Sequence, residues 1–170
     1  MRIRDIDDAL RFLPTIALFG GLQENTLKRI GSMLQEHELE PGKIVCRQGE
    51  VGRSMFIVRK GEVVITRETP KGRKVRMIRL GQGEFFGEMT LIDIQKRSAT
   101  VIVEKPSTLY SLGNRELYSL YEKDTAGYVL VVQNLCRELS RRLRTTNARL
   151  SEMAEESSED RTQIRRIPNI

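Results

Sequence analysis

The spacing of apolar residues divides the chain into three regions. In residues 1–36, two segments carry apolar side chains every three or four positions, which is the spacing of amphipathic helices. The first segment ends at Pro14, and the second begins near Gln23, after the helix-breaking pair Gly20 and Gly21. The pattern predicts an N-terminal helical segment over residues 1–36.

Between residues 37 and 113 the apolar period changes to two. Short apolar pieces are separated by turn residues such as Pro41-Gly42 and Lys60-Gly61. The strand candidates are 38–39, 44–46, 55–58, 63–67, 74–80, 100–103 and 109–112. Regularly spaced short strands are typical of sandwiches and jelly rolls. We therefore predict a mainly β fold with flanking α-helices, a double-stranded β-helix (jelly roll) over 37–113.

Helical spacing returns after residue 113. Asn114 is predicted to cap a short helix, and a longer helix begins near Asp124 or Thr125. Apolar residues in the longer helix fall at alternating steps of three and four, which forms a heptad seam. The seam comprises Val129, Val132, Cys136, Leu139, Leu143, Thr146, Leu150 and Met153.

Two arrangements explain this seam. The helix packs on its own β-roll, or two copies of the chain pair along residues 129–153 as a coiled coil. Four heptads exceed what one small roll would cover, so we favour a parallel homodimer. The C-terminal helices are then expected over 114–156, and the polar and basic residues that follow predict a disordered tail over 157–170.

Composition limits the classes of function. The 170 residues suit one domain with an appendage, and no apolar run is long enough to span a bilayer. The first residues are charged and unlike a signal peptide, so we expect a soluble cytoplasmic protein with no membrane partner. Cys46 and Cys136 have no metal-binding or redox spacing, and both are expected to be buried as small hydrophobes.

The single histidine, His37, argues against catalysis and metal binding. Small β-rolls that bind metals use several histidines, and nucleophilic catalysis commonly needs an imidazole beside a serine or cysteine. We therefore expect no enzyme activity and no metal. The net charge of +6 is spread along the chain and is attributed to an ordinary solvated surface, which makes a nucleic-acid partner unexpected.

One stretch, residues 81–101, carries candidate binding chemistry. Three glycines in its first seven residues let the backbone turn tightly and leave N–H groups accessible at the start of a short helix. Glu88 follows the last glycine, and Arg97 stands nine residues later. A carboxylate accepts hydrogen bonds from a sugar hydroxyl, and an arginine forks onto phosphate oxygens. Together these groups suit a ribose closed into a cyclic phosphate.

The stretch closely resembles the phosphate-binding cassette of the cyclic nucleotide-binding domain family. Gly87, Glu88, Arg97, Ser98 and Ala99 match that cassette in identity and spacing. The resemblance implies that Glu88 binds the ribose 2′-hydroxyl and Arg97 the cyclic phosphate. The remaining phosphate and sugar contacts are implied for Ser98, Gly87, Ala99 and the region of Met89.

The match has two departures from the family's pattern. Thr90 stands where the family usually has Ala, Ser or Gly, and it would narrow the pocket. The segment 93–96 lacks the Gly or Pro that is common just before the arginine. Neither departure removes a ligand contact, so we expect a site that binds rather than a cassette that only packs.

The resemblance also suggests residues for the base. Ile65 and Met77 fall where related domains present apolar side chains to the purine, although an inward aliphatic side chain also serves as ordinary core. The run 139–147 resembles the dimer helix of the family's transcription factors, in which residues matching Thr146 and Asn147 reach the adenine, one of them from the partner subunit. Alternatively, Thr146 only tunes the register of the coiled coil.

The sequence therefore predicts a receptor that binds cAMP, with cGMP not excluded, and that signals through its C-terminal helix. The winged helix–turn–helix that follows the dimer helix in the family's transcription factors has no counterpart in these residues. The alternatives are a dimeric interaction module with an empty or repurposed pocket and a weak DNA-binding regulator that uses the arginines of the long helix. The downstream protein partner is unknown.

Overall fold

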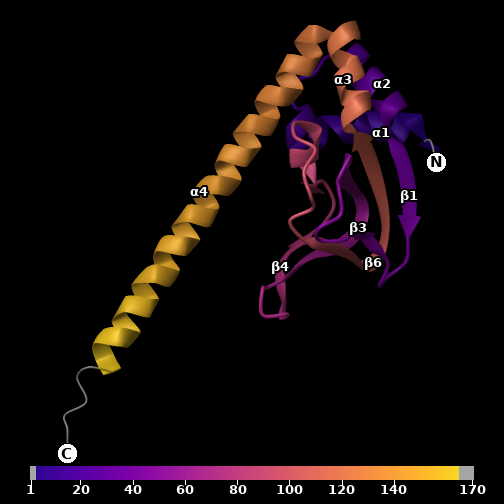
Figure 1. The fold of residues 1–170 in the computed structure, drawn as a ribbon. Helices are drawn as coiled ribbons and strands as arrows, with labels where there is room; N and C mark the ends of the chain where they lie inside the picture. The colour runs from indigo at the N-terminus through magenta and orange to yellow at the C-terminus, as the bar shows by residue number, and fades with distance from the viewer. Residues whose placement is uncertain (1–2, 165–170) are drawn as a thin grey trace, which may run out of the picture.

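The computed structural model describes the backbone of residues 3–164, with side chains as far as Glu155. A β-roll carries helices over one end, and one long helix leaves the roll as a rod (Figure 1). The elements in chain order are α1 (Ile6–Phe12), η1 (Leu13–Thr15), η2 (Ala17–Phe19), α2 (Glu24–Met33), β1 (Gln35–Leu39), β2 (Ile44–Cys46), β3 (Ser54–Glu68), β4 (Lys74–Leu80), β5 (Phe85–Phe86), η3 (Glu88–Leu91), β6 (Thr100–Gly113), α3 (Asn114–Lys123) and α4 (Thr125–Ile164). The mainly β jelly-roll fold with flanking helices is confirmed.

The roll is built around two long antiparallel strands, β3 and β6. The order in the sheet is β1-β6-β3-β4, while β2 pairs with β6 and β5 pairs with β3. Three register shifts interrupt the pairing of β3 with β6 between Val58 and Val63, where the strands bend. Four segments that were predicted as separate strands therefore belong to two continuous strands. Segments 55–58 and 63–67 are the two halves of β3, and segments 100–103 and 109–112 are the two halves of β6.

Gly61 lies where β3 bends but continues, and not in a turn between two strands. Its φ is 91°, a value that favours glycine, and a Cβ there would lie 2.2 Å from the Ser107 side-chain oxygen. Ser107 in turn accepts a hydrogen bond from the backbone N–H of Glu62 at 3.1 Å. The glycine therefore lets β6 pass close to β3 while the strand continues.

The helix starts near residues 23 and 125 match the prediction, but the cap of α3 does not. Gln23 is the N-cap of α2. The N-cap of α3 is Gly113, and Asn114 is the first helical residue. Asn114 donates its backbone N–H to the carbonyl of Arg53 at 3.0 Å, which ties the start of α3 to the start of β3. A backbone bond therefore replaces the expected side-chain cap.

The hydrophobic core has two parts. One fills the roll and includes the fully buried Val58, Val63 and Leu109. The other lies between the roll and the helices, and it joins residues of the N-terminal segment to Val131 and Leu135 of α4. This second part fixes the first turns of α4 against the roll, because removing apolar side chains from water stabilises the contact by about 25 cal/mol per Å².

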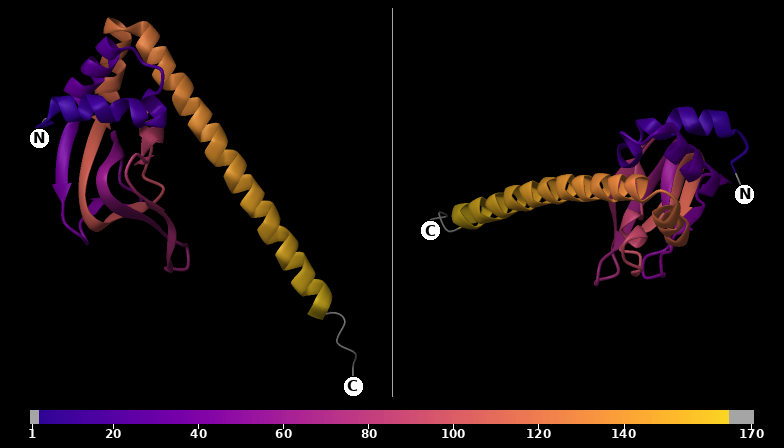
Figure 2. Two further views of the ribbon diagram at one scale, coloured as in Figure 1. Left: turned by 180° about the vertical axis from the view of Figure 1, so that it is seen from behind. Right: turned by 90° about the horizontal axis from the view of Figure 1, so that it is seen from above.

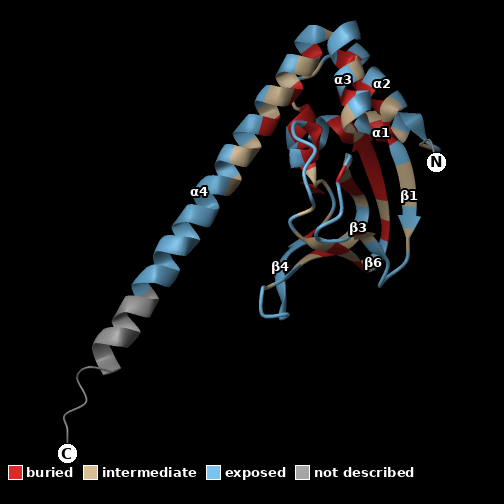
Figure 3. Ribbon diagram, in the orientation of Figure 1, coloured by how far each residue is buried: buried red, intermediate tan, exposed pale blue. Residues whose placement is uncertain are grey.

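Helix α4 packs on its own roll mainly through residues outside the heptad seam, although Leu139 of the seam is partly buried against the same core. Val131 and Leu135 are fully buried, whereas Leu143, Leu150 and Met153 of the seam are 59–63% exposed (Figure 3). Seen from above, the helix runs well beyond the roll (Figure 2). Cys46 is buried as expected, but Cys136 is exposed, because most of the seam faces away from the core.

The predicted disordered tail overlaps the end of this helix. Helix α4 continues through Ile164, so residues 157–164 are helical in the structure. The segment is polar but has no Gly or Pro before Pro168, so its backbone preferences allow the helix to continue. Residues 165–170 lie outside the described residues.

Candidate functional site

A left-handed turn at Gly87 begins the site. Strand β5 ends at Phe86, and Gly87 has φ 72° and ψ 16° before the short helix η3. A Cβ at this position would lie 2.2 Å from Nη1 of Arg97, so glycine is required both by the backbone angle and by the neighbouring guanidinium. The turn therefore brings the start of η3 and Arg97 together.

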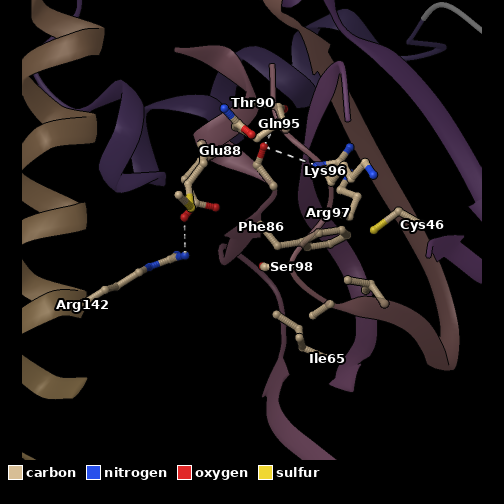
Figure 4. A pocket seen from close by; sticks show the side chains of 14 residues that line it. Cys46, Ile65, Phe86, Glu88, Thr90, Gln95, Lys96, Arg97, Ser98 and Arg142 are labelled. Carbon is tan, nitrogen blue, oxygen red and sulfur yellow. Dashed lines mark hydrogen bonds and ion pairs between the residues drawn. The ribbon is translucent and has the colours of Figure 1, made fainter. Parts of the chain in front are cut away.

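A pocket with a cavity volume of about 220 Å³ lies under this turn, at the α4 side of the roll (Figure 4). Glu88 stands on the side toward α4, and Arg97 stands on the side toward Cys46 (Figure 4). The lining comprises Cys46, Ile65, Phe86, Gly87, Glu88, Met89, Thr90, Gln95, Lys96, Arg97, Ser98, Ala99, Val101 and Arg142. All six residues predicted for the phosphate and ribose thus border one cavity.

Arg97 is held in place by the protein backbone. Its Nη2 donates to the carbonyl of Ser54 at 2.6 Å, and its Nη1 donates to the carbonyl of Gly87 at 3.5 Å. The guanidinium carbon lies 5.8 Å from the centre of the Phe56 ring. Because neutral carbonyls hold Arg97 in the described part of the chain, its positive charge remains available to an anion in the pocket.

Glu88 is buried, with 6% of its surface exposed, and its partner comes from α4. Arg142 donates from Nη1 to Oε1 of Glu88 at 3.0 Å and from Nη2 to the carbonyl of Phe85 at 3.0 Å. The same guanidinium lies 4.9 Å over the Phe85 ring. A buried carboxylate needs such a partner, because an unpaired charge out of water costs several kcal/mol.

Glu138, one turn before Arg142, completes this ionic group. It accepts hydrogen bonds from Arg141 at 2.6 Å and from Arg142 at 2.7 Å. The bond from Arg141, followed by that from Arg142, lowers the pKa of the Glu138 carboxyl to about 2. Glu138 is therefore ionised at neutral pH and orients Arg142 toward the pocket.

Sequence reasoning missed Arg142 as a site residue and treated it as one of several solvated arginines. It stands 54 residues from Glu88, and no local pattern signals the pairing. The packing of α4 on the roll, through residues that include Val131 and Leu135, turns this position of the helix toward the pocket.

Two further side chains shape the pocket wall. Thr90 is buried, and its hydroxyl donates to the carbonyl of Gly87 at 2.8 Å, which braces the turn. Burial raises the pKa of the Cys46 thiol, the largest of several effects on it, so Cys46 forms an apolar part of the wall. The threonine thus borders the cavity.

The predicted base-contacting residues are not brought together within one chain. Ile65 lines the pocket, but Met77 is 55% exposed on β4 and does not. A register shift explains the difference, because Ile65 pairs with Ile78 and Thr66 pairs with Arg76, which leaves Met77 in the bulge.

Thr146 and Asn147 are exposed on α4 and lie outside the pocket lining. The hydroxyl of Thr146 donates to the carbonyl of Arg142 at 2.9 Å on its own helix. Within the single chain, neither residue contributes to the cavity.

The described residues hold no other obvious chemical centre. Among them, no group of three or more His, Cys, Asp or Glu side chains is placed to bind a metal ion. Within the same part of the chain, no helix combines the length and apolar character that crossing a bilayer requires.

A roll that presents a buried carboxylate and a backbone-held arginine to one pocket, beside a long helix, defines a ligand-binding regulatory domain. The chain belongs to the cyclic nucleotide-binding domain family. The family model described as "Cyclic nucleotide-binding domain" matches residues 36–124, which include the whole roll from β2 onward and the site turn. The family predicted from the cassette is thereby confirmed.

Relatives of known name support this assignment. The chain is 31% identical over 144 residues to the Cyclic AMP receptor protein of Thermus thermophilus, which covers 85% of this chain and 65% of that protein. It is 30% identical over 111 residues to the cGMP-dependent protein kinase egl-4 of Caenorhabditis briggsae, which covers 65% of this chain and 15% of the kinase. The chain thus spans less than two thirds of the length of each.

Solved structures agree with the fold. The catabolite activator protein of Thermus thermophilus superposes with a TM-score of 0.73 at 30% identity, over 81% of this chain and 63% of that chain. A cyclic nucleotide-binding domain from Methylobacillus flagellatus superposes with a TM-score of 0.77 at 23% identity, over 87% of this chain and 83% of that chain. The second comparison, at lower identity, bears on the fold alone.

Proposed function

We propose that this protein is a cAMP receptor, and not an enzyme, that signals through α4. The single observation that carries the proposal is the pocket in which Glu88 and Arg97 stand on opposite sides under the Gly87 turn (Figure 4). Arginine and the first N–H groups of η3 suit a cyclic phosphate, and a buried carboxylate suits the ribose 2′-hydroxyl. Ser98 and Ala99 complete the phosphate end of the cavity.

The choice of cAMP over cGMP rests on two arguments. The relative with the widest coverage of this chain among those named above is a cyclic AMP receptor protein, although a cGMP-dependent kinase is also similar. The residues Thr146 and Asn147 resemble the adenine contacts of the family's dimer helix, and they would reach the base from α4 of either copy. The purine itself would lie against Ile65, which gives apolar contact without distinguishing the two bases.

Signalling through α4 is supported by Arg142. A ribose hydroxyl that donates to Glu88 competes with the 3.0 Å bond from Arg142, and α4 is the element that carries this arginine. Beyond Leu139 the described side chains of α4 are largely exposed, so few other contacts hold this part of the helix to the roll. Nucleotide binding would then shift the packing of α4 by the difference in affinity between the two arrangements.

The uncovered heptad seam supports a homodimer along residues 129–153. Helix α4 already packs on its own roll through Val131 and Leu135, yet Leu143, Leu150 and Met153 remain about 60% exposed. Apolar residues at this spacing gain from pairing with a second copy. In such a dimer, the resemblance to the family's dimer helix implies that one of Thr146 and Asn147 reaches the base from the partner copy.

Titration calorimetry with cAMP and with cGMP tests the proposal. We expect the wild type to bind cAMP more tightly than cGMP, and Arg97→Ala to weaken cAMP binding at least about 30-fold, which corresponds to a loss of about 2 kcal/mol or more. The control is Arg67→Ala, because Arg67 is an exposed arginine of β3 outside the pocket. Equal affinity of the Arg97→Ala and wild-type proteins would contradict the proposal.

The same titration tests one alternative function, and a DNA mobility-shift experiment tests the other. A folded dimer that shows no heat with either nucleotide favours an interaction module with a repurposed pocket. A DNA-binding regulator predicts a mobility shift that weakens steeply with salt, because phosphate contacts by the arginines of α4 would release counterions.

A further inference from the structure

The loop between β2 and β3 lies against the back of the site. The N–H of Arg97 donates to the carbonyl of Glu50 at 2.7 Å, and the N–H of Gly49 donates to the carbonyl of Arg97 at 2.9 Å. The N–H of Gly52 donates to the carbonyl of Gln95 at 3.1 Å, and an antiparallel bridge joins Val51 to Lys96. Both backbone polar groups of Arg97, the N–H and the carbonyl, are therefore hydrogen-bonded to this loop.

Within that loop, Gly52 contacts the Arg97 side chain. A Cβ built on Gly52 would lie 2.7 Å from both Cζ and Nε of Arg97 and 2.6 Å from Cγ2 of Thr90. Non-bonded contacts of real Cβ atoms are essentially never this short, and Gly52 itself is buried. Its φ lies outside the left-handed region, unlike that of Gly87. Glycine is thus required at residue 52 because a side chain would collide with its neighbours, and not because of the backbone φ angle.

We propose that Gly52 is a positioning residue for Arg97. The guanidinium occupies a slot whose walls are Gly52 and Gly87, since a Cβ on either would meet it. The carbonyl of Ser54, two residues after Gly52, accepts the 2.6 Å bond that fixes its orientation. This assignment rests on the proposed function, because the orientation matters for a phosphate in the pocket.

The slot matters because arginine has many rotamers in solution. Ordering such a side chain costs conformational entropy, and a protein that orders it before binding removes that cost from the binding step. Any side chain at residue 52 would push the guanidinium away from the Ser54 carbonyl. Thr90 sharpens the requirement, because its methyl group closes one end of the slot, where a smaller residue would leave room.

Arginine-selective ¹⁵N NMR of the ligand-free protein tests the orientation directly. We expect the wild type to show slowly exchanging Arg97 guanidinium protons, assigned by their loss in Arg97→Lys, because the group is hydrogen-bonded in a slot. Gly52→Ala should lose these signals and keep the remaining spectrum. The control is Gly81→Ala, where the nearest atom to a new Cβ lies 4.0 Å away and φ is not left-handed.

Binding gives the second readout. If the wild type binds cAMP, Gly52→Ala should weaken the affinity about tenfold or more, while Gly81→Ala should leave it unchanged. If the wild type does not bind cAMP, the proposed function fails, and the NMR comparison still decides the role of Gly52.

A second variant, Gly52→Ala with Thr90→Ala, removes the contact with the threonine methyl and leaves the contact with Arg97. It should fold and still lack the Arg97 signals. Unchanged Arg97 signals in either folded variant would overturn the proposal. Loss of folding in both would also overturn it, because residue 52 would then maintain the fold and not the orientation of Arg97.

Discussion

At the scale of single residues, the Glu88 carboxylate has two candidate hydrogen-bond partners. One is Arg142, and the other is the ribose hydroxyl of the proposed ligand. The carboxylate is almost fully buried and is paired with Arg142 at 3.0 Å. Because burying an ion out of water is costly, the carboxylate contributes to stability only while a partner is present. The group that is proposed to bind ligand is therefore also one on which the ligand-free fold depends.

Replacing Arg142 with alanine should lower the free energy of unfolding by about 1–3 kcal/mol, because it leaves the buried Glu88 without its partner. Chemical denaturation of the ligand-free protein measures this change. Arg141→Ala is the matched control, since Arg141 is an exposed neighbour that pairs with Glu138 and not with Glu88. A change of more than about 0.5 kcal/mol in the control would place the effect in α4 itself.

His37, on β1, gives a prediction for pH dependence. Burial lowers the pKa of its imidazole, whose Nε2 lies 2.8 Å from the hydroxyl of Ser111. The unfolded chain therefore takes up the proton more readily than the folded chain, so stability is complete above about pH 6.5 and falls as the pH drops through that range. Urea denaturation at pH 5.5 and 7.5 should show this fall in the wild type.

The variant His37→Gln supplies the comparison, because glutamine does not titrate and can still bond to Ser111. Its stability should change less between the two pH values than that of the wild type. An identical pH dependence in both proteins would show that carboxyl groups, and not the single histidine of the chain, produce the effect.

At the scale of elements, Asp124 connects α2 to α4. Its Oδ1 accepts the N–H of Gly127 at 2.9 Å, which caps the start of α4, and its Oδ2 accepts the hydroxyl of Thr26 in α2. These bonds, that of Thr26 first, lower the pKa of the carboxyl. The junction lies beside the core that fixes the first turns of α4.

Asp124→Ala should destabilise the protein by about 1 kcal/mol, which is typical for loss of an N-cap. Thermal denaturation at pH 7 measures the loss, and Asp124→Asn, which keeps a capping oxygen, should recover most of it. Because folding favours the ionised carboxylate and lowers its pKa, the part of the stability that Asp124→Asn does not recover should shrink as the pH falls below about 4. A difference between the wild type and Asp124→Asn that does not decrease at all between pH 7 and pH 3 would contradict a contribution from the charge.

The elements show what the sequence could predict. Periodicity located the helices and most strand segments, and the cassette residues Glu88 and Arg97 were recognised because their spacing is local. The continuous passage of β3 through Lys60-Gly61 was missed, because a glycine that allows close strand contact looks like a turn residue. Arg142 and Gly52 were missed as site residues because their roles depend on contacts between distant segments.

At the scale of the whole molecule, the two faces of α4 differ in how far they are buried. One face is buried on the roll, and the seam from Leu143 onward is exposed to solvent (Figure 3). Association of two copies would cover the exposed part of the seam and leave the most buried contacts of α4 in place, because Val131 and Leu135 are not part of the seam.

Leu143→Glu should convert the proposed dimer to a monomer, because it places a charge in the apolar seam. Sedimentation velocity measures the change as a fall to the mass of one chain. The matched control is Thr145→Glu, which adds the same charge at an exposed position outside the seam. A monomeric wild type would contradict the dimer, and dissociation of both variants would point to charge repulsion along the helix.

The length of α4 beyond Arg142 has a mechanical consequence. From Arg142 to Ile164 the helix extends about 33 Å, at about 1.5 Å per residue. A tilt of about 10° where the arginine meets the roll would displace the far end by about 6 Å. An exchange of one hydrogen bond inside a cavity of about 220 Å³ would thus become a movement large enough to open or close a contact between the two subunits of the proposed dimer.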